Sequence, residues 1–461
     1  MLKIKNNFYQ YAVVLIIGLG ILLRCIYFFK NISLFSDEAM LAQNIFECNY
    51  AELFGGLKYL QVAPPIFLIA SKFLIDIFCP QTDYLFDLTL RIIPFLCGIL
   101  ALLGFNYFLK ILPLKKTVKL FALFLLSFNP AAILYCGQFK QYSTEMFVSV
   151  ILLIIFYKII TQNKFKKRYA IIISIAPWFS LSSLFIIASG FLFSIFKKNL
   201  NLLKCLIPFC LSFILFCIFY LKSVYSVNYY GMDKCWSSSY GFLDFHHPLR
   251  LAIRVGEFFY FNKLKACIIG FYFLILSITP FFNKNNFILK MFLVVPILLT
   301  AIASLLHHWP IEARLLLFLL PIFCCLISYF EQKIKLIFLI LFCIISFYLS
   351  VQEIVLPKYD YSARESVEYL KQKITPQDIL ILDLERRKYE YYLRNNELKT
   401  IYIDKECRKD IGYCNEFIEK LPQGTYYLLT ENLDLVKLTK SIKIQDIYIK
   451  KSNVIKFNPN K

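Results

Sequence analysis

Three short segments that interrupt long apolar runs carry ionisable side chains beside aromatic ones. The candidate residues of these segments are Asp37, Glu38, Lys140, Tyr142, Glu145, His307, His308 and Arg314. A further candidate, Arg91, lies near the end of an apolar run. An ionisable group at membrane depth is energetically costly and by default marks a functional cavity. We therefore expect these segments to contribute to one shared site.

The residue types suit a displacement reaction at a phosphate leaving group. Lys140 and Arg314, with Arg91 or a histidine, could hold phosphate oxygens through ammonium and guanidinium donors. A carboxylate such as Asp37 could accept the proton of an attacking hydroxyl or amine. Two structural alternatives stay open: Asp37 and Glu38 could cap a helix, and Glu145 could be a charge at the end of a span.

No metal ligands are assigned from the sequence. His307 and His308 are either additional site residues or polar residues at the membrane interface. Asp37 and Glu145 alone are a thin ligand set for a divalent cation, which needs six or more oxygen ligands when it is calcium. A divalent cation as cofactor is therefore left open.

The composition places these segments in a membrane protein. Of the 461 residues, 59% are hydrophobic and only 18% are charged, whereas soluble domains carry charge on about a quarter of their residues. Apolar runs such as Leu120–Tyr135 and Ile334–Ser350 approach the ~20 residues that cross a bilayer. We predict a polytopic α-helical protein of about eleven spans plus an interfacial or re-entrant helix. The formal charge of +21 lies mainly beside the apolar runs, as the positive-inside rule requires, so no nucleic-acid partner is expected.

Basic loops set the expected orientation. Lys3 and Lys5 precede the first span, so the N-terminus is expected in the cytoplasm. The stretch 62–79, opened by Pro64 and Pro65, is expected to be interfacial or re-entrant, because a crossing there would place the basic loop 110–119 outside.

The same argument predicts a hairpin of two short helices over 169–196, turning near Pro177-Trp178 and Ser180–Ser183. Further spans are expected near 88–109, 118–136, 143–160, 203–221, 264–282, 287–305, 313–330 and 333–351. This topology places Asp37, Lys140 and Arg314 on the external face, together with the C-terminal tail.

The tail changes character at about residue 357. Helical patterns alternate there with strand patterns over 379–384, 398–404, 426–429 and 447–457, which predicts a small external α/β domain over 357–461. Residues 1–356 form the expected transmembrane catalytic domain. The tail has no glycine-rich phosphate loop, and a disulfide between Cys407 and Cys414 is left open.

Five motifs in order resemble the GT-C membrane glycosyltransferases, in particular the family 39-like group related to protein mannosyltransferases and aminoarabinose transferases. They are Phe35-Ser36-Asp37-Glu38-Ala39, Ala63-Pro64-Pro65-Ile66, Leu90-Arg91-Ile92-Ile93-Pro94, the stretch Gln138–Glu145, and the stretch Arg314–Pro321. Each motif is weak alone, and together they cover residues 35–325.

The resemblance implies roles for the candidate residues. The essential aspartate of the family's first external loop matches Asp37, with Glu38 beside it, and would be the base. The donor side would be formed by Lys140, Tyr142 and Glu145, with Arg314 at the donor phosphate. The chain departs from many relatives in one respect: Gln61-Val62-Ala63 precedes the paired prolines where they have Lys or His. Lys58, Lys140 or His307 would have to replace that cation.

The resemblance implies an inverting glycosyltransferase of the bacterial inner (plasma) membrane. It would transfer a hexose or pentose from a polyprenyl-phosphate donor to a lipid, glycan or protein acceptor on the external face. A polysaccharide polymerase or O-antigen ligase is the alternative, and those enzymes typically place a large functional loop late in the chain. A lipid or glycan transporter is a third reading, although no internal repeat supports it.

Overall fold

The structure is a computed structural model. In the N-terminal part it describes residues 2–162, 165–197, 204–221, 236–240 and 287–328. In the C-terminal part it describes residues 363–375, 377–382, 386–394, 399–402, 425–430, 444–449 and 453–457, with a few isolated residues elsewhere. Cys407 and Cys414 lie outside the described residues.

Contacts divide the chain into two compact units. The helical unit comprises Met1–Lys30, Cys48–Phe78 and Leu88–Leu356. The sheet unit comprises Asn31–Glu47, Cys79–Asp87 and Pro357–Lys461, so it includes two segments from the N-terminal part of the chain. The expected boundary between a catalytic domain over 1–356 and an α/β domain over 357–461 stays a prediction.

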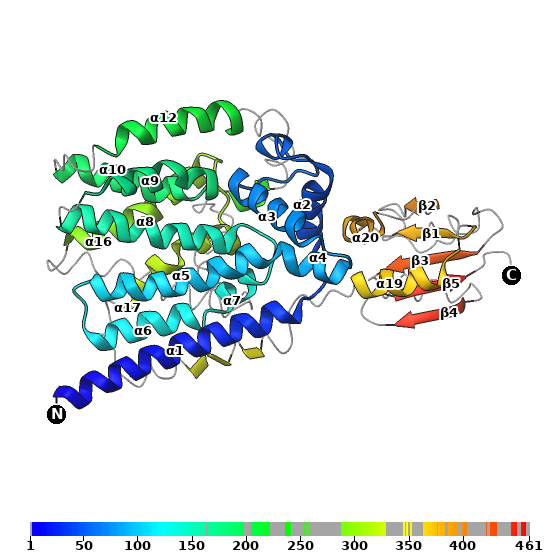
Figure 1. The fold of residues 1–461 in the computed structure, drawn as a ribbon, viewed down its shortest axis with the longest axis horizontal. Helices are drawn as coiled ribbons and strands as arrows, with labels where there is room; N and C mark the ends of the chain where they lie inside the picture. The colour runs from blue at the N-terminus through cyan, green and yellow to red at the C-terminus, as the bar shows by residue number, and fades with distance from the viewer. Residues whose placement is uncertain are drawn as a thin grey trace. The chain divides into compact units, whose positions relative to one another are not determined.

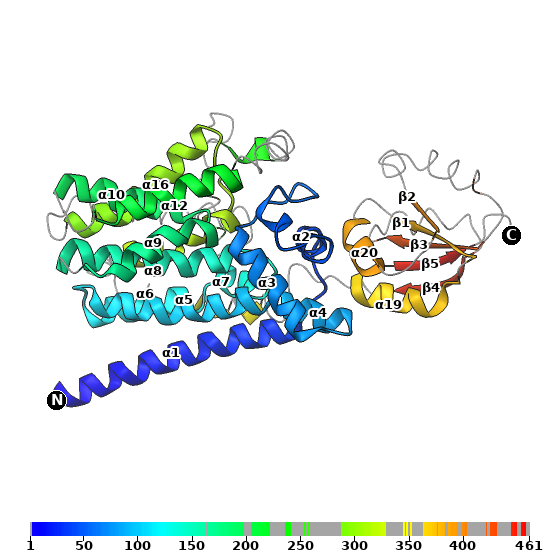
Figure 2. The ribbon, with the colours of Figure 1, turned by 45° about the horizontal axis from the view of Figure 1, so that its top comes forward.

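Long helices lie side by side in the helical unit (Figure 1). Its described elements are α1 (Leu2–Lys30), η1 (Glu52–Phe54), α3 (Pro65–Phe78), α5 (Ile92–Ile111), α6 (Lys116–Ser127), α7 (Pro130–Cys136), α8 (Tyr142–Gln162), α9 (Lys167–Phe179), α10 (Ser183–Lys197), α12 (Leu206–Phe216), η2 (Cys217–Leu221), η3 (Ser237–Ser239), α16 (Phe287–Leu305), η5 (Ala313–Leu319) and α17 (Leu320–Ser328). In both Figure 1 and Figure 2, α3 and α7 lie at the end of this unit away from the N-terminus of the chain.

Three helices of the described part are long and apolar enough to cross a bilayer: Asn7–Lys30, Asp83–Ile111 and Tyr142–Thr161. The pair formed by α6 and α7 becomes a fourth if it counts as one span. Shorter apolar helices account for several of the remaining expected spans. The stretches 264–282 and 333–351 lie wholly or mostly outside the described residues, so the total of about eleven stays a prediction.

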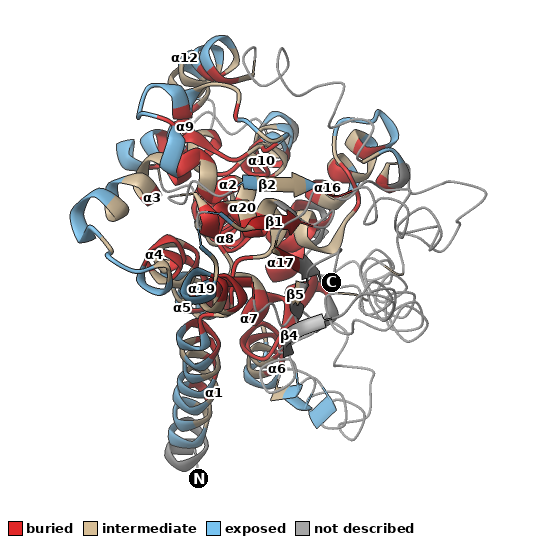
Figure 3. Cartoon of the chain, turned by 90° about the vertical axis from the view of Figure 1, so that its right-hand side faces the viewer, coloured by how far each residue is buried: buried red, intermediate tan, exposed pale blue. Residues whose placement is uncertain are grey.

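Apolar side chains also cover the outside of the helical unit. Along α1, Phe8 and Tyr11 are both 73% exposed, while Arg24 on the same helix is fully buried. Exposed apolar residues continue along α12 at Ile207, Leu211 and Ile214. In Figure 3 these helices show pale blue, and red lies further inside. Many large apolar side chains exposed on the outside of a protein are unfavourable in water and suit contact with lipid.

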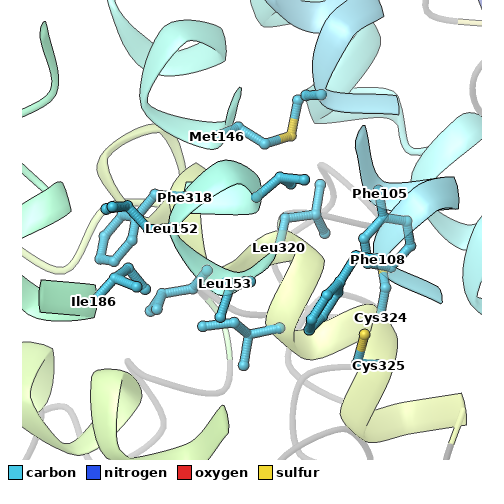
Figure 4. Packing of buried hydrophobic residues seen from close by; sticks show 14 of the residues in the cluster. Phe105, Phe108, Met146, Leu152, Leu153, Ile186, Phe318, Leu320, Cys324 and Cys325 are labelled. Atoms are coloured by element: carbon cyan, nitrogen blue, oxygen red, sulfur yellow. The ribbon is translucent and has the colours of Figure 1, made fainter. Parts of the chain in front are cut away.

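The core of the helical unit packs around α8. Phe105 and Phe108 of α5 and Phe318 of η5 belong to the same buried cluster as Met146 and Leu153 of α8 (Figure 4). The side chains of α17 complete the cluster, including Leu320, Cys324 and Cys325. The buried cysteines act here as small polarizable apolar residues, as their position inside apolar runs indicates.

The stretch 118–136, where one span is expected, contains two helices with a break at Phe128 and Asn129. The helices α6 and α7 meet at an angle of 46°. Pro130 has no N–H to continue α6, and the Asn129 side chain caps α7 by accepting from the Ala132 N–H at 2.9 Å. The buried Arg24 guanidinium donates to the Ser127 and Leu126 carbonyls, at 2.8 and 3.1 Å, and thereby satisfies the broken end of α6.

Two other features of the helical unit agree with the expectations from the sequence: the short helix that begins at the proline pair, and the two helices over 169–196. The stretch opened by the proline pair forms α3, which has 14 residues and is too short to span a bilayer unaided. The stretch 169–196 forms two helices, α9 and α10, which are interrupted at Ser180 to Ser182.

The sheet unit contains a five-stranded mixed sheet in the order β2-β1-β3-β5-β4. Its strands are β1 (Ile379–Leu382), β2 (Lys399–Tyr402), β3 (Tyr426–Thr430), β4 (Ile444–Ile449) and β5 (Asn453–Phe457). Strand β1 pairs in parallel with β2 and β3, whereas β5 runs antiparallel to β3 and β4. The helices of this unit are α2 (Ser36–Glu47), α19 (Ala363–Lys373) and α20 (Arg386–Leu393), and α4 (Asp83–Leu90) begins within it.

Candidate functional site

Lys140 is buried and contacts a residue far from it in the sequence. Its Nζ donates to Gln61 Oε1 at 2.7 Å, and the lysine is only 7% exposed. The amide nitrogen of Gln61 donates to the Tyr59 carbonyl at 3.3 Å. The amide of Gln61 is therefore held on both sides, and its oxygen faces the ammonium group.

The two residues after Gln61 are bound in the same manner. Gln141 Nε2 donates to the Val62 carbonyl at 3.4 Å, and the Tyr220 hydroxyl donates to the Ala63 carbonyl at 2.7 Å. We call Gln61, Lys140, Gln141 and Tyr220 the Lys140 cluster. The cluster holds the three residues that precede the proline pair. Its hydrogen bonds thereby connect the start of α3 to the start of α8.

The backbone before this cluster is strained. Tyr59 and Leu60 have φ values of 61° and 53°, in the left-handed region that non-glycine residues seldom adopt. Such conformations persist only where the surroundings over-determine them, and they concentrate at functional sites. The Lys140–Gln61 hydrogen bond is one of the contacts that hold this turn.

Two buried polar atoms beside Lys140 have no hydrogen-bond partner among the described residues. They are Gln141 Oε1 and Ser143 Oγ, and Ser143 is fully buried. Native proteins leave few buried polar atoms unpaired, and each such atom calls for a water or a ligand. The start of α8 therefore offers both a cation and free polar atoms.

Glu145 is also buried, one turn further along α8. Its carboxylate accepts hydrogen bonds from the Ser182 hydroxyl and from the backbone N–H groups of Leu181 and Ser182. These donors belong to the interruption between α9 and α10. Three donors on one carboxylate indicate that Glu145 holds this turn; its expected place on the donor side stays a prediction.

Arg314 lies at the start of η5 and stacks over the Trp236 ring, 5.0 Å from the ring centroid. The same short segment of the 225–262 loop contacts two neighbours of Arg314. Ser239 Oγ donates to Glu312 Oε1, and Tyr240 stacks on His307 with ring centroids 5.1 Å apart. The segment 236–240 thus contacts the segment 307–314 at Arg314 and His307. Both segments are expected on the external side of the membrane.

His307 ends helix α16. Its φ is 59°, and its N–H donates to the Ser304 carbonyl while the His308 N–H donates to the Ala303 carbonyl. This is the Schellman arrangement, in which glycine usually takes the left-handed position. The backbone of His307 and His308 therefore forms the C-terminal cap of α16.

Asp37 and Glu38 differ in their environment although they are neighbours. Glu38 Oε2 accepts from the Phe35 N–H at 3.0 Å, which is the capping-box contact at the start of α2. Glu38 is 2% exposed, and Asp37 is partly exposed in the same first turn. The capping alternative thus applies to Glu38, and Asp37 remains the candidate base.

The other expected residues are buried. Arg91 is 2% exposed at the junction of α4 and α5, and Tyr142 is 4% exposed at the start of α8. The Tyr142 ring packs edge-on against Tyr135. Asp37 and Glu38 belong to the sheet unit and the remaining candidates to the helical unit, so their convergence on one site stays a prediction.

Several residues at these positions were not singled out from the sequence. Trp236 contacts Arg314 and Tyr220 binds the Ala63 carbonyl, yet no local pattern distinguishes them; Ser182 was noted only as part of the expected turn. Gln61 was noted only as a departure from the family pattern. Within the described residues, no group of three or more His, Cys, Asp or Glu side chains could hold a metal ion.

No family model and no curated protein matches the sequence. Solved structures do match it over nearly its whole length. ArnT from Cupriavidus metallidurans bound to undecaprenyl phosphate has a TM-score of 0.57 at 11% identity, with 97% of this chain and 98% of that chain covered. The apo form of the same protein gives 0.56 at 10% identity, with 98% of each chain covered.

A second solved structure is similar over a smaller share of its own length. AglB, the archaeal oligosaccharyltransferase from Archaeoglobus fulgidus in complex with an inhibitory peptide and a dolichol-phosphate, has a TM-score of 0.52 at 13% identity. The match covers 94% of this chain and 69% of that chain. The resemblance that five short motifs indicated is thereby confirmed at the level of the fold: the chain shares its fold with ArnT and AglB.

Proposed function

We propose that the protein is a membrane glycosyltransferase that uses a polyprenyl-phosphate-linked sugar as donor and acts with inversion on the external face of a bacterial inner membrane. The acceptor would be a lipid, a glycan or a protein. The fold supports this proposal, because the similar structures include ArnT bound to undecaprenyl phosphate and AglB in complex with a dolichol-phosphate.

The observation that carries the proposal is the buried ammonium of Lys140 against Gln61. Many relatives have a cation directly before the paired prolines, and here Lys140 reaches that position from the start of α8. A cation that is shielded from water binds an anion more strongly than an exposed one, because the effective dielectric constant is lower. Gln141 Oε1 and Ser143 Oγ would pair with donor hydroxyls or with bound water.

The reaction follows from these groups as a single displacement. The acceptor oxygen or nitrogen attacks the anomeric carbon while Asp37 takes its proton. The bond between that carbon and the phosphate oxygen breaks, and the lipid phosphate leaves with one more negative charge than it had in the donor. Lys140, with Arg314 and Arg91 as further candidates, would bind the more highly charged leaving group more tightly than the donor, which lowers the barrier.

The bilayer would deliver the donor laterally to the end of the helical unit that contains α3 and the start of α8. The N-terminus lies at the opposite end of this unit (Figure 1). If the N-terminus is cytoplasmic, as Lys3 and Lys5 indicate, the Lys140 cluster faces the external side.

The proposal is tested with the full chain in proteoliposomes. The substrates are a panel of synthetic undecaprenyl-phosphate pentoses and hexoses together with an envelope extract of the producing cells. The measured product is undecaprenyl phosphate, detected by mass spectrometry. We expect release with at least one donor, and at least a hundredfold lower rate in Asp37→Asn, because general-base catalysis contributes about that much.

Glu38→Gln is the matched control. Its amide oxygen can still accept from the Phe35 N–H, so helix α2 keeps its cap and the release rate should stay near that of the wild type. Wild-type release by Asp37→Asn would contradict the proposed mechanism, and absence of release with every donor in the panel would contradict the proposed function.

A further inference from the structure

Asp87 is a fully buried carboxylate of the sheet unit. Its Oδ2 accepts from Arg364 Nη1 at 2.7 Å and from the Tyr392 hydroxyl at 2.6 Å. The Tyr391 hydroxyl lies 3.3 Å from Oδ1. Burial, and next the charge of Asp87, raises the pKa of both tyrosines well above its usual range, so the two hydroxyls remain protonated and act as donors.

Arg364 and Tyr392 also bind the segment 31–34. Arg364 Nη2 donates to the Asn31 carbonyl at 2.8 Å, and the Arg364 N–H donates to Ser33 Oγ at 3.2 Å. The Tyr392 hydroxyl accepts from the Leu34 N–H at 2.8 Å. Asn31, Ser33 and Leu34 are therefore held by two residues that come more than 300 positions later.

The held segment leads directly into the helix that carries Asp37. Helix α2 begins at Ser36, two residues after Leu34. At the other end of α2, the Arg394 guanidinium lies 5.2 Å from the centroid of the Phe46 ring and also stacks on Tyr391. Arg394 is in turn paired with Asp83 at 2.8 Å. Residues near both ends of α2 are thus bound to α20 and its neighbours.

A buried ion pair is a weak source of stability, because desolvation offsets much of its attraction. The Asp87–Arg364 pair has a more specific consequence: it orients a guanidinium whose second nitrogen binds the Asn31 carbonyl. Asn31 itself has a φ of 40° and donates to the Tyr84 carbonyl at 2.8 Å. The direction in which the chain enters α2 therefore depends on this network.

We propose that Arg364 and Tyr392 are positioning residues for Asp37, with Asp87 as the buried anion that orients both. The inference rests on the proposed function, because it assigns the C-terminal residues a part in the reaction through the segment that carries the base. A displacement of a reacting group by about 1 Å can reduce a rate by about a hundredfold.

Tyr392→Phe tests the proposal, since it removes one hydroxyl and keeps the ring. We expect kcat for undecaprenyl phosphate release to fall about tenfold, while KM for the donor and Kd for undecaprenyl phosphate stay unchanged. Amide hydrogen exchange over residues 34–39 should become faster. Tyr427→Phe is the matched control, because the Tyr427 hydroxyl of the same sheet unit donates to the Lys373 carbonyl at 3.0 Å; it should change neither kcat nor exchange at 34–39.

A double-mutant cycle with Asp37→Asn separates positioning from general damage to the fold. If Tyr392 acts through Asp37, Tyr392→Phe should cause no further loss of rate in the Asp37→Asn background. A further tenfold loss in that background would overturn the proposal, as would a wild-type kcat in Tyr392→Phe or unchanged exchange at residues 34–39. Absence of release with every donor in the panel would instead contradict the proposed function itself, so the two failures are distinguishable.

Discussion

The Lys140 ammonium and the Gln61 side-chain oxygen are 2.7 Å apart, although 79 residues separate them in the chain. This contact brings a cation to the residues that precede Pro64 and Pro65. It also joins the start of α8 to the start of α3, so a change at either residue should affect the same site.

Lys140→Gln should weaken donor binding. Loss of a hydrogen bond from a charged group corresponds to ~1.5–3 kcal/mol, so Kd for undecaprenyl phosphate should rise about tenfold to a hundredfold. Binding can be followed by native mass spectrometry of the purified protein. The swapped variant Lys140→Gln with Gln61→Lys restores one ammonium and one amide, and we expect it to recover much of the lost affinity. Equal affinity of Lys140→Gln and the wild type would rule out a phosphate contact by Lys140.

Glu145→Ala should destabilise the helical unit rather than change donor binding. The substitution leaves two buried backbone N–H groups without the Glu145 carboxylate as acceptor and removes one of the two partners of the Ser182 hydroxyl, and each unpaired buried group costs about 1–3 kcal/mol. Glu145→Gln keeps one acceptor oxygen and should lose less stability. SDS-induced unfolding of the purified protein measures both. A stable Glu145→Ala protein with poor donor binding would instead assign Glu145 to the donor site.

Arg24→Met should lower the stability of the protein, because Arg24 binds the backbone at the break between α6 and α7. The Ser127 and Leu126 carbonyls would lose their donor, at a cost of about 3 kcal/mol. Asn129→Ala removes the cap of α7 and should cost ~1 kcal/mol. Tyr11→Leu on the same helix as Arg24 is the control, since Tyr11 is 73% exposed and should leave the unfolding midpoint unchanged. Equal midpoints for Arg24→Met and the wild type would show that the break does not depend on Arg24.

His307→Gly should be tolerated. Glycine adopts the left-handed conformation at no steric cost, and the lost stacking on Tyr240 corresponds to ~0.5–1.5 kcal/mol. We expect a change in unfolding free energy within about 1 kcal/mol and a release rate within about twofold of the wild type. A much lower release rate in a stable His307→Gly protein would show that the imidazole contacts a substrate.

Local sequence patterns determined much of the helical unit. The proline pair starts α3 within one residue of the expected position, and the serines at 180–183 coincide with the interruption between α9 and α10. The break before Pro130 was not predicted, although asparagine followed by proline is a helix-start signal. In the tail, the expectation of one strand over 447–457 is wrong: the stretch covers the end of β4 and all of β5, which pair antiparallel. These signals act between near neighbours, which is why one sequence suffices to reveal them.

The pairings that define the candidate site were decided by the tertiary structure alone. Lys140 with Gln61, Arg24 with Ser127 and Asp87 with Arg364 join residues 79, 103 and 277 positions apart. Composition, hydropathy and charge bias are properties of single segments, so they give each segment its type and its expected side of the membrane. Which buried donor meets which acceptor depends on how helices far apart in the chain pack together. The sequence by itself thus determined that Lys140 and Asp37 are unusual residues, and only the packing decided what holds each of them.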